Sequence, residues 1–178
     1  DTQGGFWFTD HGSTTHEYRT HGALYYAKAD GSQITQVLRE LISPNGVGLS
    51  PDGKTVYYAE TFTARLWSLP LTKPGKGAKV PGFTPGVFVG AYPGIAYFDS
   101  LGVQADGGVC VATILAGGIT TFGPGAGKVK HTAIADPLVT NICWGGRNMK
   151  TAYITASGTG KLLAMNWPKP GLRLNYNA

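Results

Sequence analysis

The stretch Gly46-Val-Gly-Leu-Ser-Pro-Asp-Gly-Lys-Thr-Val-Tyr-Tyr-Ala-Glu60 predicts the fold of the chain. Its two short apolar runs are separated by a Pro-Asp-Gly turn, a pattern typical of a β-hairpin. A polar turn followed by a short apolar strand occurs four times in the sequence. The four segments are Gln3–Asp10, Asp52–Glu60, Asp106–Thr113 and Asn148–Thr155.

The four segments repeat at nearly constant spacing. Phe6, Val56, Val109 and Ala152 occupy equivalent positions, so the repeat lengths are 50, 53 and 43 residues. These lengths are close to the roughly 40–50 residues of a propeller blade. Further strands are expected at 23–28, 65–71, 118–122 and 161–167 in the third position of each unit, and at 33–38, 87–92 and 129–135 in the outer position. Four strands per unit make one blade, which predicts an all-β fold with about three and a half blades.

The repeat divides the chain into four units. They are an incomplete blade at residues 1–43, blades at 44–97 and 98–138, and a last blade at 139–178. The first unit lacks its innermost strand, and blades are normally buried against a neighbour on both faces. We therefore expect about two and a half further blades, roughly 100–130 residues at the blade length above, to be missing from the N-terminal side. Truncation, proteolytic nicking and division into two chains are the alternatives, and a companion N-terminal polypeptide is expected to complete the propeller.

Composition excludes several classes of protein. Hydrophobic residues make up 42% of the chain, too many for a disordered protein, and no apolar run approaches the roughly 18 residues of a membrane span. The net charge of +5 comes from scattered basic residues, a pattern that does not favour nucleic-acid binding. Cys110 and Cys143 lie in apolar runs and are expected to be buried thiols. Localisation stays open, because any targeting segment would precede Asp1. A cytoplasmic location is favoured.

Polar residues stand at the start of three innermost strands. Asn45, Asp99 and Asn141 occupy this place in successive units, and equivalent positions of a propeller face a common central channel. Amide and carboxylate oxygens are ligands suited to calcium, magnesium or manganese. The sequence therefore suggests a shared cation site. The alternative is that these residues only form turns ahead of the strands, where Asn and Asp are frequent.

The segment Pro44–Thr61 resembles the hallmark blade of the gluconolactonase/regucalcin (senescence marker protein) family. Other segments resemble successive elements of the same family in the same order, namely Phe6–Asp10, Phe98–Gly107, Gly117–Ile119, Thr140–Gly146 and Pro170–Leu172. The resemblance implies a six-bladed propeller with one divalent cation in its channel. Of the four family ligands, two match Asn45 and Asp99, while the family's glutamate and its other asparagine would lie before Asp1.

The same resemblance implies a metal-dependent lactonase, a carboxylic-ester hydrolase that opens a sugar or related lactone. Calcium is the favoured cation, with magnesium, manganese or zinc as alternatives. A bound cation polarises the lactone carbonyl and lowers the pKa of water. Asp99 is then expected to be both ligand and catalytic base, with its pKa held low by the cation. Asn141 is expected either to bind substrate hydroxyls or to act only as a turn residue.

His11, His16 and His21 recur at intervals of five residues in the segment 10–22. Zinc binding by all three is disfavoured because a flexible loop does not preset ligand geometry. A polar surface loop is one alternative. The other, favoured by the resemblance, is a loop that overhangs the substrate, with His11 nearest the cation. His131, in a predicted outer strand, is expected to face solvent.

Two other functions stay open. One is an esterase or phosphotriesterase acting through the same cation, and the other is a non-catalytic propeller that serves as a binding scaffold. A serine hydrolase is excluded because the sequence contains no G-x-S-x-G elbow. Glu60 and Arg65 flank a short loop and are expected to form a structural ion pair.

Overall fold

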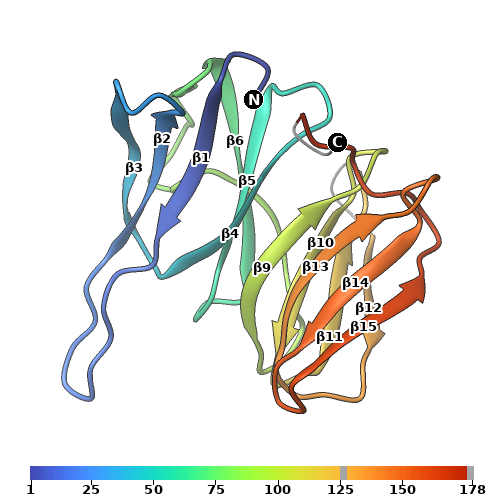
Figure 1. Cartoon of the computed structure of the whole chain (residues 1–178). Helices are drawn as coiled ribbons and strands as arrows, with labels where there is room; N and C mark the ends of the chain where they lie inside the picture. The colour runs from blue at the N-terminus through green and yellow to red at the C-terminus, as the bar shows by residue number, and fades with distance from the viewer. Residues whose placement is uncertain (125–127, 176–178) are drawn as a thin grey trace.

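The computed structural model describes residues 1–124 and 128–175 as β-strands joined by turns and loops, which confirms the predicted all-β class. Figure 1 shows four sheets that follow one another along the chain, from the blue N-terminal sheet to the red C-terminal sheet. Each strand pairs antiparallel with the next along the chain within its sheet, except that β7 and β8 both pair with β6. Within the described ranges, no helix has the length and apolar character that crossing a membrane would require.

The first sheet contains β1 (Gly5–Asp10), β2 (Gly22–Lys28) and β3 (Ile34–Leu41). The second contains β4 (Pro44–Leu49), β5 (Thr55–Glu60), β6 (Arg65–Lys73), β7 (Lys76–Gly77) and β8 (Val87–Ala91). The third contains β9 (Tyr97–Val103), β10 (Val109–Ile114), β11 (Gly118–Phe122) and β12 (Val129–Ala133). The fourth contains β13 (Val139–Gly145), β14 (Thr151–Ala156) and β15 (Lys161–Asn166). The sequence did not predict β7, whose two residues have no β-branched or aromatic character.

Three hydrophobic cores lie between successive sheets. Alternate side chains of a strand point to opposite faces, so an inner sheet serves two cores at once. On β10, Val109 and Val111 belong to the core shared with the second sheet, whereas Cys110 and Ala112 belong to the core shared with the fourth. The first and second sheets share a third core, which includes Leu24, Leu41, Val56, Tyr58, Trp67 and Leu69. This face-to-face packing is the arrangement of successive blades in a propeller.

The innermost strands approach one another at backbone contact. A Cβ atom at Gly46 of β4 would lie 2.6 Å from the backbone nitrogen of Leu101 and 2.7 Å from the carbonyl oxygen of Asp99, both on β9. A Cβ at Gly102 would lie 3.0 Å from the carbonyl oxygen of Ile142 on β13. Glycine is required at these positions because the facing backbone leaves no room for a side chain.

A buried carboxylate joins two loops of the fourth sheet. Asp136, only 3% exposed, accepts hydrogen bonds from the backbone N–H groups of Leu138, Gly158 and Thr159 at 2.7–3.1 Å. The Thr159 hydroxyl donates a further bond of 2.7 Å. Burial by itself would raise the pKa of Asp136, but these hydrogen bonds outweigh it and lower the pKa. Asp136 therefore fixes the β14–β15 turn to the segment that enters β13.

The predicted ion pair between Glu60 and Arg65 is wrong. Glu60 is 2% exposed and accepts hydrogen bonds from Ile42 N, the Thr63 hydroxyl and Trp67 Nε1. The ion pairs within the described ranges are Arg39–Glu40 and Asp106–Lys169, so the predicted Glu60–Arg65 pair is not formed.

His131 and Cys143 also differ from the sequence expectation. His131 is half-buried, and its Nδ1 lies 3.1 Å from the Thr120 hydroxyl, because its face of β12 packs against Tyr92. Cys110 is buried as predicted, and burial raises the pKa of its thiol to about 12. Cys143 is an exposed free thiol, because its face of β13 points away from the core that the fourth sheet shares with the third.

Replacing Gly46 with alanine is expected to destabilise the protein, because the new Cβ would overlap backbone atoms of β9 rather than a flexible side chain. We expect a loss of about 1–3 kcal/mol, which lowers Tm by roughly 3–10 °C in calorimetry. Gly123→Ala is the matched control, since its Cβ would have a nearest contact at an ordinary 3.6 Å. Equal melting temperatures for the two variants would contradict the close approach.

Replacing Asp136 with asparagine is expected to lower Tm at pH 7 by roughly 5 °C, because the amide nitrogen cannot accept the bonds that a carboxylate accepts. Since folding lowers the pKa of Asp136, its stabilisation is present above the unfolded value of about 3.9. It is lost as the pH falls through the lower folded value. Calorimetry between pH 7 and pH 2 should therefore show the two curves converging in acid. Glu17→Gln, in an exposed loop, is the control, and a gap that persists in acid would refute the assignment.

Candidate metal and substrate site

Asn45 and Asp99 lie side by side where β4 and β9 come into contact. Asn45 is the second residue of β4 and Asp99 the third of β9, and both are half-buried. The Asn45 side chain lies close enough to the Asp99 carboxylate to lower its pKa in part. The Thr9 hydroxyl, from β1, donates a hydrogen bond of 2.5 Å to the backbone carbonyl oxygen of Asn45. Residues of three different sheets therefore meet at this point, as the repeat spacing predicts for Asn45 and Asp99.

Burial has the largest effect on the pKa of Asp99. Desolvation raises the pKa of Asp99, while the nearby Asn45 side chain, the Ser100 backbone and the charge of His11 lower it in part. The net effect is a raised pKa. The sequence prediction of a low pKa assumed a bound cation, so the carboxylate of the chain alone has the opposite shift.

Thr61 connects the two strands that carry Asn45 and Asp99. Its N–H donates to Ser43 O at 2.9 Å, and its carbonyl accepts from Phe98 N at 3.2 Å. Ser43 lies two residues before Asn45 and Phe98 directly precedes Asp99, so one residue of the β5–β6 loop holds both strand starts. The ring of His11 approaches Thr61 as well, with Nε2 3.3 Å from its hydroxyl.

His11 lies at the entrance of the long loop between β1 and β2, which extends below its sheet at the lower left of Figure 1. It is half-buried, whereas His16 and His21 are exposed. In the part of the chain that the structure describes, no three His, Cys, Asp or Glu side chains are placed to share a metal ion. The loop therefore brings His11 alone to Asp99, and zinc binding by the three histidines has no support.

The sequence analysis did not predict a cluster of Arg19, Phe62 and Tyr97 that contacts His11. The guanidinium of Arg19 lies 3.5 Å from the centre of the Phe62 ring, a cation–π contact. Phe62 also contacts the His11 ring, at a centroid distance of 5.8 Å, and the Tyr97 ring, at 5.4 Å. Tyr97 could have been found from its position two residues before Asp99 on one strand. Nothing in the local sequence indicated that Arg19 folds back onto Phe62.

The Asn141 side chain forms its hydrogen bond with the next residue of its own strand. Its side-chain oxygen accepts a hydrogen bond of 2.8 Å from the backbone nitrogen of Ile142, and its side chain is exposed. The pairing of β13 with β14 shifts register between Val139 and Asn141. Asn141 therefore lies inside β13 and not in a turn, and these contacts do not bring it to Asn45 and Asp99.

The arrangement of Asn45 and Asp99 can supply part of the coordination of a hard cation. One amide and one carboxylate, both half-buried, supply oxygen ligands of the kind that calcium, magnesium and manganese take. Partial desolvation accounts for the raised pKa of Asp99. The residues present thus fit a divalent cation but supply only part of its coordination.

Comparison with known proteins agrees with this fold. Among curated proteins, the lactonase drp35 of Staphylococcus saprophyticus is 38% identical over 92 residues, which cover 48% of this chain and 28% of that protein. Among solved structures, a calcium-binding regucalcin from Agrobacterium tumefaciens superposes with a TM-score of 0.72 at 19% identity, covering 96% of this chain and 62% of the other. A gluconolactonase from Xanthomonas campestris superposes with a TM-score of 0.66 at 19% identity, covering 85% and 50%.

The chain spans less than two thirds of each of these proteins. Because sequence identity to the two solved structures is only 19%, the superpositions show the propeller fold alone. A family model describing the SMP-30/Gluconolactonase/LRE-like region matches residues 1–158, most of the chain. The chain therefore belongs to the SMP-30/gluconolactonase/LRE-like family.

Proposed function

We propose that the chain forms part of a metal-dependent lactonase, in which Asn45 and Asp99 help to hold one divalent cation. The observation that carries the proposal is the close approach of β4 and β9 at Gly46, which places Asn45 near Asp99. The two residues are separated by more than fifty positions in sequence and come from different sheets. Family membership and the lactonase and gluconolactonase relatives support lactone hydrolysis as the reaction. A sugar or related lactone is the substrate class proposed.

Calcium is the cation we favour. It takes six to eight oxygen ligands in flexible geometry, and the regucalcin neighbour is described as calcium-binding. Magnesium and manganese prefer similar oxygen donors, and zinc accepts carboxylate oxygens too. Since Asn45 and Asp99 provide only part of such a shell, further ligands must come from outside the chain or from water.

The reaction requires a water molecule to attack the lactone carbonyl carbon. A bound divalent cation supplies Lewis acidity, which polarises the carbonyl and acidifies water. Asp99 orients the attacking water and accepts its proton as the carbon–oxygen bond forms. The ring ester bond then breaks, and the proton passes to the alkoxide that leaves the carbonyl, giving the hydroxy acid. The rings of His11 and Tyr97 both contact Phe62, and these three side chains are the ones that we propose the lactone contacts.

We further propose that a companion polypeptide completes the propeller and the cation shell. The chain covers 62% of the regucalcin structure with which it superposes. The outer faces of the first and fourth sheets are not covered by another sheet among the described residues, whereas the second and third sheets share cores on both faces. The companion would cover those outer faces and bring the remaining ligands to Asn45 and Asp99.

Replacing Asp99 with asparagine is expected to lower kcat for D-glucono-δ-lactone by roughly 10²–10⁴-fold, the contribution of general base catalysis. The protein should be assayed as purified, together with any polypeptide that accompanies it, by following acid release in a pH-stat. Asp30→Asn is the matched control, because Asp30 lies in the exposed β2–β3 turn and bonds locally to Ser32. Full activity of D99N would rule out the proposed role.

Removal of divalent cations is expected to abolish the same activity, and calcium should restore it. In calorimetric titration, D99N should lose calcium binding while D30N retains it, because a carboxylate ligand is lost only in the first. Activity that survives chelation, with calcium binding unchanged in D99N, would contradict the cation site. A protein that binds calcium at Asp99 without hydrolysing any lactone would instead be a binding scaffold.

A further inference from the structure

Arg19 is a positively charged side chain beside the candidate site that has no negative partner among the described residues. Its guanidinium carbon lies 3.5 Å from the centre of the Phe62 ring, and the two ion pairs formed within the described ranges involve other residues. A cation–π contact holds a cation in place without neutralising its charge. The charge of Arg19 is therefore free to attract an anion from outside the chain.

The way in which Arg19 contacts Phe62 leaves its hydrogen-bond donors available. Carbon atoms in contact lie about 3.5–4.0 Å apart. With the guanidinium carbon at 3.5 Å, a nitrogen turned toward the ring would overlap it, so the guanidinium lies flat on Phe62. Its N–H groups then point sideways, beyond the edge of the ring, and the residue is exposed. A planar fork of donors in this position matches the oxygens of a carboxylate or a phosphate.

Arg19 belongs to a hydrogen-bonded hairpin within the long loop between β1 and β2 (Figure 1). It forms an antiparallel bridge with Thr14, and backbone hydrogen bonds of 2.8 and 2.9 Å lie on the two sides of this bridge. A Cβ at Gly12 would lie 2.7 Å from the carbonyl oxygen of Thr20, so the two arms of the loop also meet near its base. The hairpin therefore fixes the position from which Arg19 extends to Phe62.

Phe62 links Arg19 to the residues around Asp99. The same ring contacts the rings of His11 and Tyr97, at centroid distances of 5.8 and 5.4 Å. Tyr97 lies two residues before Asp99 on the same strand, and the charge of His11 lowers the pKa of Asp99 in part. A lactone whose ester lies at Asp99 therefore extends past the Phe62 ring toward Arg19.

The carboxylates of the same loop leave Arg19 available. Asp10 accepts a hydrogen bond of 3.0 Å from the backbone nitrogen of Gly12, and Glu17 is exposed and forms no ion pair within the described ranges. Water and salt screen the charge of an exposed arginine. A bound anionic group is therefore expected to gain affinity on the order of tenfold, as a hydrogen bond to a charged group does.

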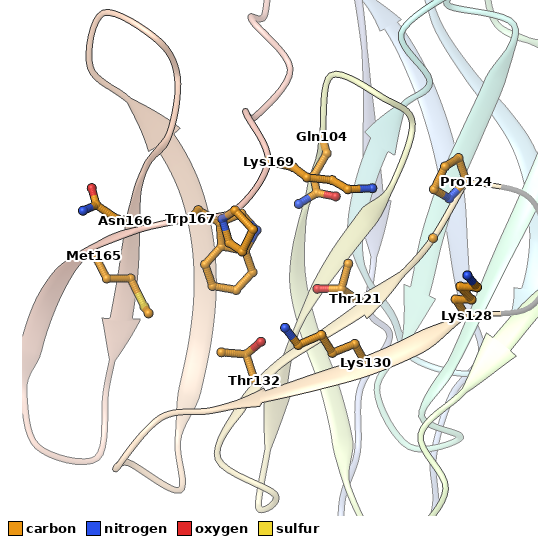
Figure 2. Close-up of a pocket in the computed structure, with 12 residues that line it drawn as sticks. Gln104, Thr121, Pro124, Lys128, Lys130, Thr132, Met165, Asn166, Trp167 and Lys169 are labelled. Carbon is orange, nitrogen blue, oxygen red and sulfur yellow. The ribbon is translucent and has the colours of Figure 1, made fainter.

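A second basic place has a separate lining. Figure 2 shows a cavity of about 850 Å³ between the end of β15 and the outer strands of the third sheet. Lys128, Lys130 and Lys169 line this cavity, and neither Arg19 nor Asp99 does. Lys130 forms no ion pair within the described ranges. It is therefore the matched control for a positive charge that does not lie beside Asp99.

We propose that Arg19 is a specificity-determining residue that binds an anionic group of the lactone, a carboxylate or a phosphate on the carbon chain away from the ring ester. Asp99 acts at the ester, and the Arg19 guanidinium donates paired hydrogen bonds to the anionic group at the far end. The substrate class is then an acidic sugar lactone and not a neutral one. This inference rests on the proposed lactone hydrolysis, and separate outcomes test the two.

The first test compares lactones that differ only at their terminal carbon. D-glucaro-1,4-lactone against D-glucono-1,4-lactone tests a carboxylate, and 6-phospho-D-glucono-1,5-lactone against D-glucono-1,5-lactone tests a phosphate. The protein as purified, with any polypeptide that accompanies it, should prefer one acidic lactone to its neutral partner at least tenfold in kcat/KM. Arg19→Met, which keeps an apolar chain on Phe62 without the charge, should lose this preference. Lys130→Met should keep it.

The second test measures binding without hydrolysis. In calorimetric titration with calcium present, D-glucarate or 6-phospho-D-gluconate should bind to the wild-type protein at least tenfold more tightly than D-gluconate. Arg19→Met should bind all three acids equally, and Lys130→Met should behave as wild type does.

The outcomes separate this inference from the proposed function. Hydrolysis of lactones with no preference for an acidic one overturns the role of Arg19 and leaves the proposed function standing. A preference that survives in Arg19→Met, or that disappears in Lys130→Met, overturns it as well. If no lactone is hydrolysed, the proposed function fails, and the titrations alone decide whether Arg19 binds an anion: equal binding of the three acids to the wild-type protein would then reject the anion site too.

Discussion

The contact of β4 with β9 at Gly46 is the constraint on which the candidate site depends. Because a Cβ at this position would lie within 2.7 Å of backbone atoms on β9, only glycine allows the two strands to meet. That approach places Asn45, the preceding residue, against Asp99. The Thr61 backbone then holds both strand starts through bonds to Ser43 and Phe98. Packing of the innermost strands and assembly of the site are therefore the same event in this fold.

Much of the fold could be predicted because each repeat carries its own strand signals. Turn residues and short β-branched runs predicted most strands within a few residues of their observed bounds. The nearly constant repeat length predicted that Asn45 and Asp99 would lie close together. The errors arise where neighbours decide the outcome. Glu60 lies opposite Arg65 across the hairpin, yet Ile42, Thr63 and Trp67 donate to it instead. A residue 18 positions away, such as Ile42, leaves no signal in a local pattern.

The position of a sheet in the array explains the remaining differences. Val109, Val111, Cys110 and Ala112 are all buried because β10 has a neighbouring sheet on both faces. Cys143 has a similar apolar context in sequence but is exposed, since its face of β13 has no covering sheet among the described residues. Sequence patterns report that a strand is apolar, but only the number of adjacent sheets determines which of its faces is buried.

The central claim is that Asn45 and Asp99 bind one divalent cation. The most direct measurement is anomalous diffraction from crystals of the purified protein soaked in manganese, which takes the same oxygen ligands. The account predicts one strong anomalous peak within about 2.0–2.6 Å of an Asn45 side-chain oxygen and an Asp99 carboxylate oxygen. Manganese peaks elsewhere, with none beside Asn45 and Asp99, would contradict it.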